Sequence, residues 1–260
     1  MSYQLPSSDE INAVDLSWRR YLLPAIHPEG MKILAAEAVI VVLVGLLGLL
    51  WAPLYSLYVL GLAVLVFSFY FFRNPPRVPP LGDRLVLAPA DGIVSNIVKM
   101  VPPPELGCGD EPLIRVSIFM SVFSVHVNRA PVGGTVTALK YVPGKFVSVQ
   151  DKDSEDNERM LIAMRTPYGE TVGFVQIAGL VARRIYCPLK LKDQLKAGDV
   201  FGMIRFGSRL DVFLPKGVTP KVRPGQVAVA GESILAELPP VDRERRVLTV
   251  GGVAPGREGR

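Results

Sequence analysis

Two long apolar runs near the N-terminus dominate the hydrophobic pattern of this chain. The first run, Ile33–Trp51, contains a single charged residue, Glu37, and the second, Leu54–Phe72, contains none. Each run approaches the roughly 20 residues that a helix needs to cross a hydrocarbon core of about 30 Å. Ala52-Pro53 interrupts the pattern between them. The pattern predicts a two-helix membrane hairpin, with an in-plane or re-entrant hairpin as the alternative.

The segments on either side of this hairpin (residues 33–72) differ in character. Residues 1–32 are polar to mixed and lack the cleavage pattern of a secretory signal, so we expect a cytoplasmic or interfacial segment. Residues 73–80 are rich in proline and predict an extended, stiff linker. Basic residues flank both ends of the hairpin: Arg19, Arg20 and Lys32 before it, Arg73 and Arg77 after it. By the positive-inside rule we expect both ends, and the domain that follows, on the cytoplasmic face of the cell (inner) membrane.

Residues 81–238 have the pattern of short strands separated by turns. The predicted strands lie in Val86–Val98 (two strands), Leu113–Met120, Gly134–Val142, Met160–Thr166, Thr171–Ile177, Val181–Ile185, Val200–Ile204 and Leu210–Leu214. The Gly-Asp-Val and Gly-Gln-Val segments at 198–200 and 225–227 have the turn-then-strand pattern of biotinyl- and lipoyl-type folds. The fold class we expect is mostly β, a compact antiparallel barrel-sandwich-hybrid-like domain preceded by the transmembrane hairpin. Residues 239–260 are rich in Arg, Gly and Pro and predict a flexible tail.

Composition narrows the classes of partner. The 260-residue chain is 49% hydrophobic, and it carries a formal charge of +5 from 29 Lys and Arg against 24 Asp and Glu. The apolar hairpin favours an anionic lipid surface over nucleic acid as the reason for this charge, and no nucleic-acid-binding motif occurs. The two cysteines, Cys108 and Cys187, form no CxxC pair, so we expect neither a disulfide framework nor a metal site.

A Gly-Ser pair between two strand-like segments carries the candidate chemistry. By composition alone Gly207-Ser208 is an ordinary turn. The alternative is a reaction, because the Ser208 hydroxyl can attack the Gly207 carbonyl, which no side chain shields. The acyl group then moves from nitrogen to oxygen, β-elimination of the ester cuts the chain, and loss of ammonia converts the dehydroalanine at 208 to a pyruvoyl group. The products are chains 1–207 and 208–260.

A serine nucleophile needs a base, and the chain has only two histidines. His27 precedes the hairpin, so its proximity to Ser208 is hard to argue. His126 lies in the strand-like segment Val122–Val127, where a buried structural histidine is the alternative to a base. Asp91 lies in a Pro-Ala-Asp-Gly turn, where aspartate commonly bonds backbone amides.

The ordered set of segments resembles a known family. Its members are the hairpin ending in Phe71-Phe-Arg-Asn-Pro75, the segment Ala88-Pro-Ala-Asp-Gly92, the segment Val125-His-Val-Asn-Arg-Ala-Pro131, and the Gly-Ser site. Together they resemble the phosphatidylserine decarboxylase proenzymes, in particular the short prokaryotic (type A) pyruvoyl-dependent ones, from about the second apolar run to Leu238.

The resemblance implies an activity and partners. The pyruvoyl group at Ser208 would form a Schiff base with the serine headgroup of membrane phosphatidylserine, accept electrons as CO2 leaves, and yield phosphatidylethanolamine. The covalent pyruvoyl group would be the cofactor, with no metal and no nucleic acid. The two chains from self-cleavage would stay associated, and a homo-oligomer is left open.

The resemblance also implies roles for single residues. Ser208, His126 and Asp91 become the catalytic candidates, with Asp91 orienting or charge-balancing the histidine. Arg129 and Arg205 are the candidates for contacts to the headgroup. Longer family members carry a H-x-x-H-M-P pattern, and alignment on Pro131 puts His126 at the first histidine but Arg129 at the second. The base for self-cleavage therefore stays open.

Two other functions remain as alternatives. One is the same chemistry on another serine phospholipid, such as archaetidylserine. The other is a non-enzymatic, membrane-anchored hybrid-barrel adaptor. The nearest match to a carrier lysine is Lys145 in Pro-Gly-Lys-Phe, which is poor, and the long heptads typical of adaptors do not occur.

Overall fold

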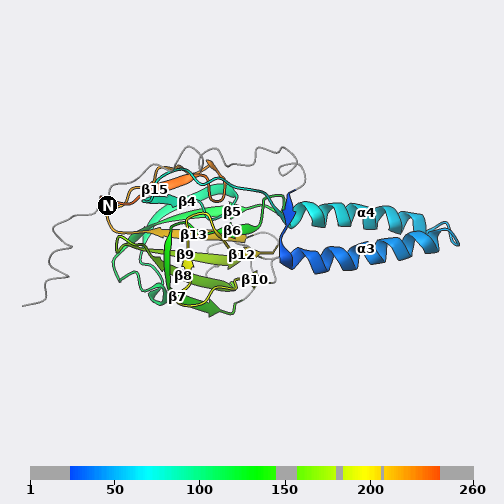
Figure 1. Cartoon of the computed structure of the whole chain (residues 1–260), viewed down its shortest axis with the longest axis horizontal. Coiled ribbons are helices and arrows are strands. Elements are labelled where there is room, and N and C mark those ends of the chain that lie inside the picture. Colours follow the sequence, from blue (N-terminus) through cyan, green and yellow to red (C-terminus); the bar gives the residue numbers. More distant parts are fainter. Residues whose placement is uncertain (1–23, 145–156, 180–183, 206–207, 241–260) are drawn as a thin grey trace, which may run out of the picture.

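The computed structural model describes residues 24–144, 157–179, 184–205 and 208–240. Two apolar helices form a hairpin that projects from one end of a β-rich domain (Figure 1). The predicted N-terminal segment (residues 1–32), the predicted strand Val181–Ile185 and the predicted tail (residues 239–260) fall mostly outside the described residues.

The hairpin consists of α3 (Pro28–Gly48) and α4 (Leu54–Phe71). Helix α3 begins before the apolar run because proline is favoured in a first turn and His27 caps it, its Nδ1 accepting from the Glu29 amide at 3.3 Å. Both helices are long and apolar enough to cross a membrane, and only 11% of each span is buried within the protein. Side chains so apolar and so exposed to the surroundings indicate membrane association.

Close packing holds the two helices together. A Cβ built on Gly30 would lie 2.4 Å from the Cβ of Phe72, so the Phe72 side chain packs directly against the backbone of Gly30 and leaves no room for a larger residue there. Farther along, Ser68 Oγ donates to Glu37 Oε1 at 2.9 Å. The single charged residue of the first apolar run is thereby paired inside the hairpin.

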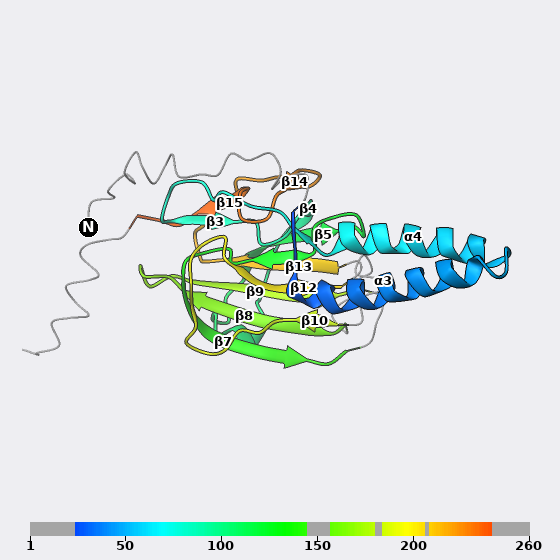
Figure 2. The same ribbon diagram turned by 45° about the vertical axis from the view of Figure 1, so that its right-hand side comes forward.

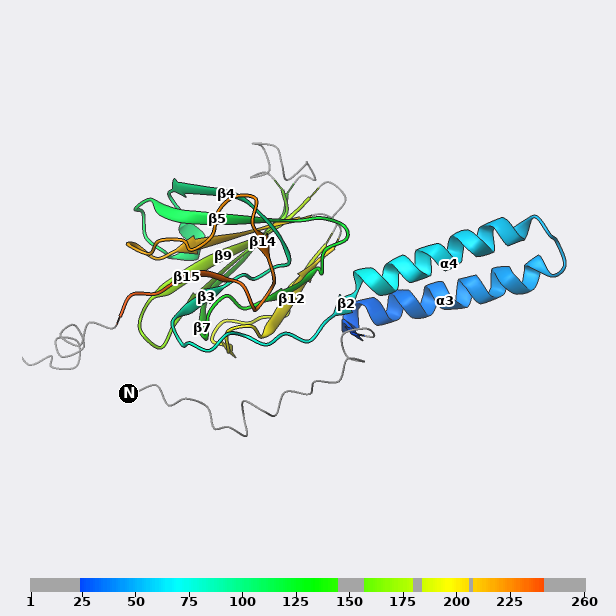
Figure 3. The same cartoon turned by 90° about the horizontal axis from the view of Figure 1, so that it is seen from above.

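The base of the hairpin is joined to the β domain. Strands β1 (Ala25–Ile26) and β2 (Arg73–Asn74) pair antiparallel and close the hairpin. Phe71 and Phe72 pack in one buried cluster with Val125, Val127 and Met203 of the domain. The helices are therefore anchored by packing as well as by the linker. Figure 3 shows the linker running from β2 at the base of the hairpin to the domain.

The domain is built from antiparallel strands (Figure 2). An eight-stranded sheet has the order β11-β7-β8-β9-β13-β5-β4-β14, a three-stranded sheet has the order β10-β12-β6, and β15 pairs with β3. The bounds are β3 Leu85–Leu87, β4 Gly92–Met100, β5 Leu113–Met120, β6 Val127–Arg129, β7 Gly134–Val142, β8 Arg159–Arg165, β9 Thr171–Ala178, β10 Ile185–Tyr186, β11 Gln194–Leu195, β12 Val200–Ile204, β13 Ser208–Leu214, β14 Val227–Ala228 and β15 Ile234–Glu237, with a 3-10 turn at Pro104–Leu106.

Strand β13 lies at the centre of the large sheet, between β5 and β9. Its side chains alternate between the two faces. Leu210, Val212 and Leu214 enter the main hydrophobic core, whereas Phe213 enters a second cluster on the other face. A residue at the start of β13 is thus flanked by a strand on each side.

The structure confirms the predicted fold class, a mostly β antiparallel domain preceded by an apolar helical hairpin. The predicted strand over Val122–Val127 is wrong. A turn bonded between Ser121 and Ser124 occupies its first half, and β6 begins only at Val127. The hydroxyls of two serines bond local backbone amides and favour a turn there.

Candidate active site at the hairpin end of the central strand

Ser208 is the first residue of β13 and is fully buried. It pairs with Met120 of β5 on one side and with Ala178 of β9 on the other. Its Oγ donates to the Met120 Sδ at 3.2 Å. A thioether is a weak acceptor, so within the described residues this hydroxyl has no strong hydrogen-bond partner. Gly207, the predicted partner in self-cleavage, lies outside the described residues.

Two buried amides are linked to this serine through the Met120 sulfur, and sequence reasoning missed both. Asn128 of β6 has its Nδ2 3.8 Å from the same Met120 sulfur, and its Oδ1 accepts from Gln176 Nε2 at 2.8 Å. Gln176 Oε1 is buried without a hydrogen-bond partner among the described residues. A buried polar atom left unpaired is costly and marks a functional candidate. In the sequence, Gln176 could have been recognised as a candidate because it is a polar residue within the apolar predicted strand Thr171–Ile177.

His126 is fully buried between the Ser121–Ser124 turn and β6. Its Nδ1 lies 2.9 Å from the Ser124 carbonyl oxygen. A carbonyl only accepts, so Nδ1 donates and Nε2 is the acceptor of the neutral ring. Nε2 is buried without a partner in the part of the chain that the structure describes. Phe71, the last residue of α4, stacks on this ring at 4.1 Å between centroids.

The surroundings of His126 hold its imidazole neutral. Its pKa is lowered from 6.5 to about 4, mainly by burial and to a smaller extent by the positive charge of Arg73, while the bond to Ser124 opposes both effects. At neutral pH the ring therefore presents an uncharged nitrogen acceptor. This is the protonation state that a general base requires.

Asp91 is held by other groups than His126. Its Oδ2 accepts from Arg77 Nη2 at 2.7 Å, and its Oδ1 accepts from the Ala230 amide at 2.8 Å. The described residues show no contact between Asp91 and His126. The negative charge of Asp91 acts on two neighbouring arginines. Burial lowers the pKa of Arg73 and of Arg129, and Asp91 partly opposes this effect by raising both.

The two arginines predicted to contact a headgroup instead hold the base of the hairpin. Arg129 donates to the Gly198 and Pro75 carbonyls and to the Asn74 side chain, at 2.8–3.1 Å. Arg205 Nη2 lies 2.5 Å from Glu29 Oε2 in the first turn of α3. His27 lies closer to the β domain than its sequence position suggested, since its ring packs edge-on against Tyr186 of β10.

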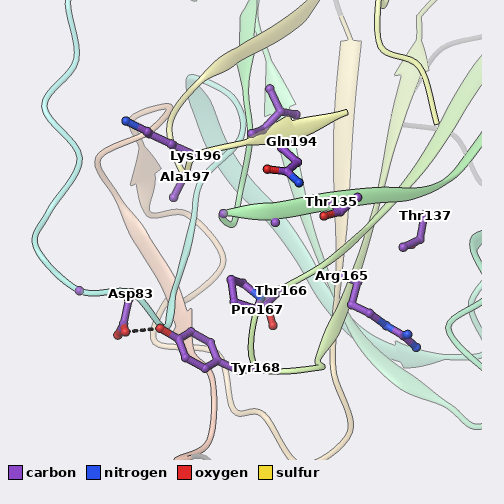
Figure 4. A pocket seen from close by; sticks show the side chains of 14 residues that line it. Asp83, Thr135, Thr137, Arg165, Thr166, Pro167, Tyr168, Gln194, Lys196 and Ala197 are labelled. Atoms are coloured by element: carbon purple, nitrogen blue, oxygen red, sulfur yellow. Dashed lines mark hydrogen bonds between the residues drawn. The ribbon is translucent and has the colours of Figure 1, made fainter. Parts of the chain in front are cut away.

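A pocket of about 710 Å³ lies at the opposite end of the large sheet (Figure 4). It is lined by the start of β7 and the end of β8, including Gly134 and Arg165, and it contains none of the predicted site residues. Arg165 pairs with Thr171 at the first residue of β9, whereas Ser208 pairs with Ala178 at the last. Pocket and serine are therefore separated by the length of that strand. The described residues hold no cluster of three or more metal-ligating side chains.

Fold and site together define a class, a membrane-associated antiparallel β protein with a buried serine and a neutral buried histidine where the domain joins its helical hairpin. The chain belongs to the phosphatidylserine decarboxylase family, whose sequence model matches residues 64–236. It is 52% identical over 221 residues, covering 85% of this chain and 93% of the relative, to a phosphatidylserine decarboxylase proenzyme of Cereibacter sphaeroides. A phosphatidylserine decarboxylase proenzyme of Ruegeria pomeroyi is 49% identical over 224 residues, covering 86% of this chain and all of the relative. These matches confirm the resemblance drawn from the ordered motifs.

Proposed function

We propose that this protein is a pyruvoyl-dependent phosphatidylserine decarboxylase that matures by cutting itself between Gly207 and Ser208. The observation that carries the proposal is the state of Ser208: a fully buried hydroxyl on a central strand, bonded to a thioether. A hydroxyl that donates no strong hydrogen bond to the described residues is available to attack a carbonyl carbon. Membership of a family whose relatives are named proenzymes supports the same reading.

Self-cleavage begins with transfer of the Gly207 acyl group from the Ser208 nitrogen to the Ser208 hydroxyl oxygen. Ser208 Oγ bonds to the Gly207 carbonyl carbon, the C–N bond breaks, and the nitrogen takes a proton, which leaves an ester and a free amine. Loss of the Cα proton of residue 208 expels the Gly207 carboxylate and leaves dehydroalanine. Water then enters and ammonia leaves, so that residue 208 becomes a pyruvoyl group at the start of the 208–260 chain. When formed, this group supplies the electrophilic carbonyl that takes up electrons during decarboxylation.

We assign the proton transfers to His126 Nε2. Its Nδ1 proton is held by Ser124, so the orientation and tautomer of the ring are set before reaction. A pKa of about 4 makes Nε2 a weak base that stays unprotonated at neutral pH and readily returns any proton it accepts. In this scheme Asp91 acts at a distance, on the charges of Arg73 and Arg129.

Lipid access follows from the position of the site. The serine headgroup of phosphatidylserine would reach residue 208 at the end of the domain from which the hairpin projects. The basic residues of the hairpin flanks favour the cytoplasmic face for that end. Arg129 and Arg205 would then act on the substrate indirectly, by holding the hairpin base in place. The two chains stay together because β13 pairs along its length with both neighbours.

The test is the intact mass of the purified full chain, together with CO2 release from phosphatidylserine. We expect the wild type to give two fragments that meet between residues 207 and 208, the smaller having a blocked N-terminus that borohydride reduces. Ser208→Ala should remain one chain of 28.3 kDa without turnover. The matched control is Ser117→Ala on β5, since the Ser117 hydroxyl is buried too and has no hydrogen-bond partner among the described residues. Normal processing of Ser208→Ala would overturn the proposal.

His126→Gln separates the catalytic role of this histidine from a packing role. If Nε2 moves protons, the variant should slow processing, turnover or both while the thermal midpoint changes little. If both rates match the wild type, His126 is a structural residue and the base must be sought elsewhere.

A further inference from the structure

A short rigid turn links the two halves of the candidate site. It spans Ser121–Ser124 between Met120, whose sulfur contacts Ser208, and His126. The Ser124 amide donates to the Ser121 carbonyl, and the Ser121 and Phe123 amides donate to serine hydroxyls. These bonds fix the turn locally, so the turn presents its tip residue in one direction.

The tip residue is apolar and points outward. Phe123 is 64% exposed, although burying a phenylalanine is among the larger gains available to a folding chain. Its outward position is imposed by the serine-bonded turn. An exposed aromatic on a rigid tip marks a contact surface.

Phe123 also contacts the hairpin, which indicates what covers this surface. The Phe123 ring lies edge-on to Phe67 of α4, 6.5 Å between centroids at an interplanar angle of 90°. Phe67 lies four residues, about one turn, before the end of α4 at Phe71. The Phe123 carbonyl also accepts from Arg73 Nη2 at 3.0 Å. Phe123 is therefore level with the last turn of a helix that is apolar enough to cross a membrane.

We infer that the Ser121–Ser124 turn is a second membrane contact, which inserts Phe123 into the lipid interface beside the hairpin and holds the Ser208 end of the sheet against the bilayer. The occupant of this surface is the bilayer itself. The inference rests on the membrane placement of the hairpin within the proposed function, because Phe123 shares the depth of Phe67.

The charged and aromatic neighbours suit the headgroup level. Arg73 lies 3.5 Å over the Tyr70 ring and donates to the Tyr70 carbonyl, so its guanidinium remains at the end of α4. Arginine with a tyrosine ring is a pairing typical of membrane interfaces. Phe123 would enter the zone just below this level, where acyl chains begin.

The turn gives the contact a consequence for catalysis. His126 Nδ1 bonds the carbonyl of Ser124, and Met120 immediately precedes the turn. A tip fixed in the interface therefore sets the height of both side chains relative to the lipid headgroups. A serine headgroup could then reach residue 208 while its acyl chains remain in the bilayer.

The test uses single-tryptophan proteins reconstituted into vesicles of phosphatidylcholine and phosphatidylglycerol with brominated acyl chains. Trp18→Phe leaves Trp51 at the far end of the hairpin as the reporter of hairpin insertion. Trp18→Phe/Trp51→Phe with Phe123→Trp gives the tip reporter. The control reporter comes from Leu191→Trp in the same background, since Leu191 is 58% exposed and precedes β11 at the opposite end of the sheet.

We expect bromine to reduce the emission of Trp51 and of the tip reporter and to leave the control reporter unchanged, with the emission of the tip reporter shifted to shorter wavelength. Quenching of Trp51 without quenching of the tip reporter overturns the inference and leaves the proposed function intact. Absence of quenching at Trp51 overturns both the hairpin placement and the inference. Self-cleavage of each variant, read by mass, reports the proposed chemistry separately.

A kinetic readout tests the consequence in the unlabelled enzyme. Phe123→Ser should raise the apparent KM for the mole fraction of phosphatidylserine in vesicles by about fivefold, the effect of withdrawing roughly half a phenylalanine side chain from an apolar phase. The kcat should stay the same, and Leu191→Ser should match the wild type in both constants. Equal KM values for the two serine variants would overturn the role of the tip in substrate access.

Discussion

Phe71 covers the His126 ring, so removing it should change how strongly that imidazole binds a proton. Phe71 is fully buried and stacks on the ring at 4.1 Å with an interplanar angle of 31°. Burial is the largest cause of the lowered pKa of His126, which is about 4 instead of 6.5. A gap of about 2.5 pKa units corresponds to about 3 kcal/mol of preference for the neutral ring.

Phe71→Ala should let water reach one face of the imidazole. Because water stabilises the charged form, we expect the pKa of His126 to rise by at least about one unit, or about 1.4 kcal/mol. The vacated volume should also cost about 3–5 kcal/mol of stability. Phe71→Leu keeps most of the apolar volume, so its effect on the pKa should be smaller and in the same direction.

The assay is an NMR titration of the imidazole carbons in detergent, and His27→Gln leaves His126 as the single histidine of the chain. The acid limb of the turnover profile should move to higher pH with the pKa. A wild-type pKa near 6.5, or an unchanged pKa in Phe71→Ala, would refute the reasoning that the hairpin desolvates this residue.

Stability should follow the same titration. Since the pKa of folded His126 is lowered, the unfolded chain binds a proton between pH 6.5 and about 4 while the folded chain does not. The free energy of unfolding should therefore fall as the pH drops through that window, by about 3 kcal/mol. His126→Gln should flatten this part of the profile, and a profile with the same slope would contradict the assignment to His126.

Two further experiments test the hairpin base. Gly30→Ala gains about 1 kcal/mol of helix propensity but places a Cβ 2.4 Å from the Phe72 side chain. The resulting overpacking should cost about 1–3 kcal/mol and lower the thermal midpoint. Gly133→Ala is the control and should be tolerated, because its Cβ meets no atom nearer than 3.5 Å. A double-mutant cycle on Arg205 and Glu29, whose side chains are 20% and 31% exposed, should give a coupling of about 0.5–1 kcal/mol that weakens in salt, and a coupling of several kcal/mol would show that lipid or protein shields the pair.

Elements with strong local patterns were predicted well from the sequence. The prediction for β5 matches its observed bounds, and that for β7 does too, because each has a clear run of strand-forming residues between turns. The start of β13 was predicted two residues late. Ser208 and Arg209 form part of the strand because Met120 and Ala178 pair with Ser208 from both sides, which local composition does not reveal.

The residues of the candidate site also differ in how far the local sequence reveals them. Ser208 and His126 can be recognised from the sequence because each has a reactive side chain of its own: Ser208 follows a glycine, and His126 is one of few histidines. Asn128 and Gln176 were missed because their partnership exists only where β6 and β9 approach each other. Asp91 was expected beside the histidine, but the structure pairs it with Arg77, and nothing local to a Pro-Ala-Asp-Gly turn distinguishes these partners.

Arg129 shows why the proton transfers fall to one histidine in our proposal. The resemblance drawn from the sequence puts Arg129 in the place of a second histidine, and in this chain Arg129 uses three hydrogen bonds to tie the linker at Asn74 and Pro75 to the carbonyl of Gly198. A guanidinium does not deprotonate in proteins, so it cannot act as a base at this position. What it does instead is hold the hairpin base against the domain, which keeps Phe71 over His126. Arg129 thus supports the burial of His126 only indirectly, through the position of the hairpin, and this links the membrane hairpin to the chemistry proposed at Ser208.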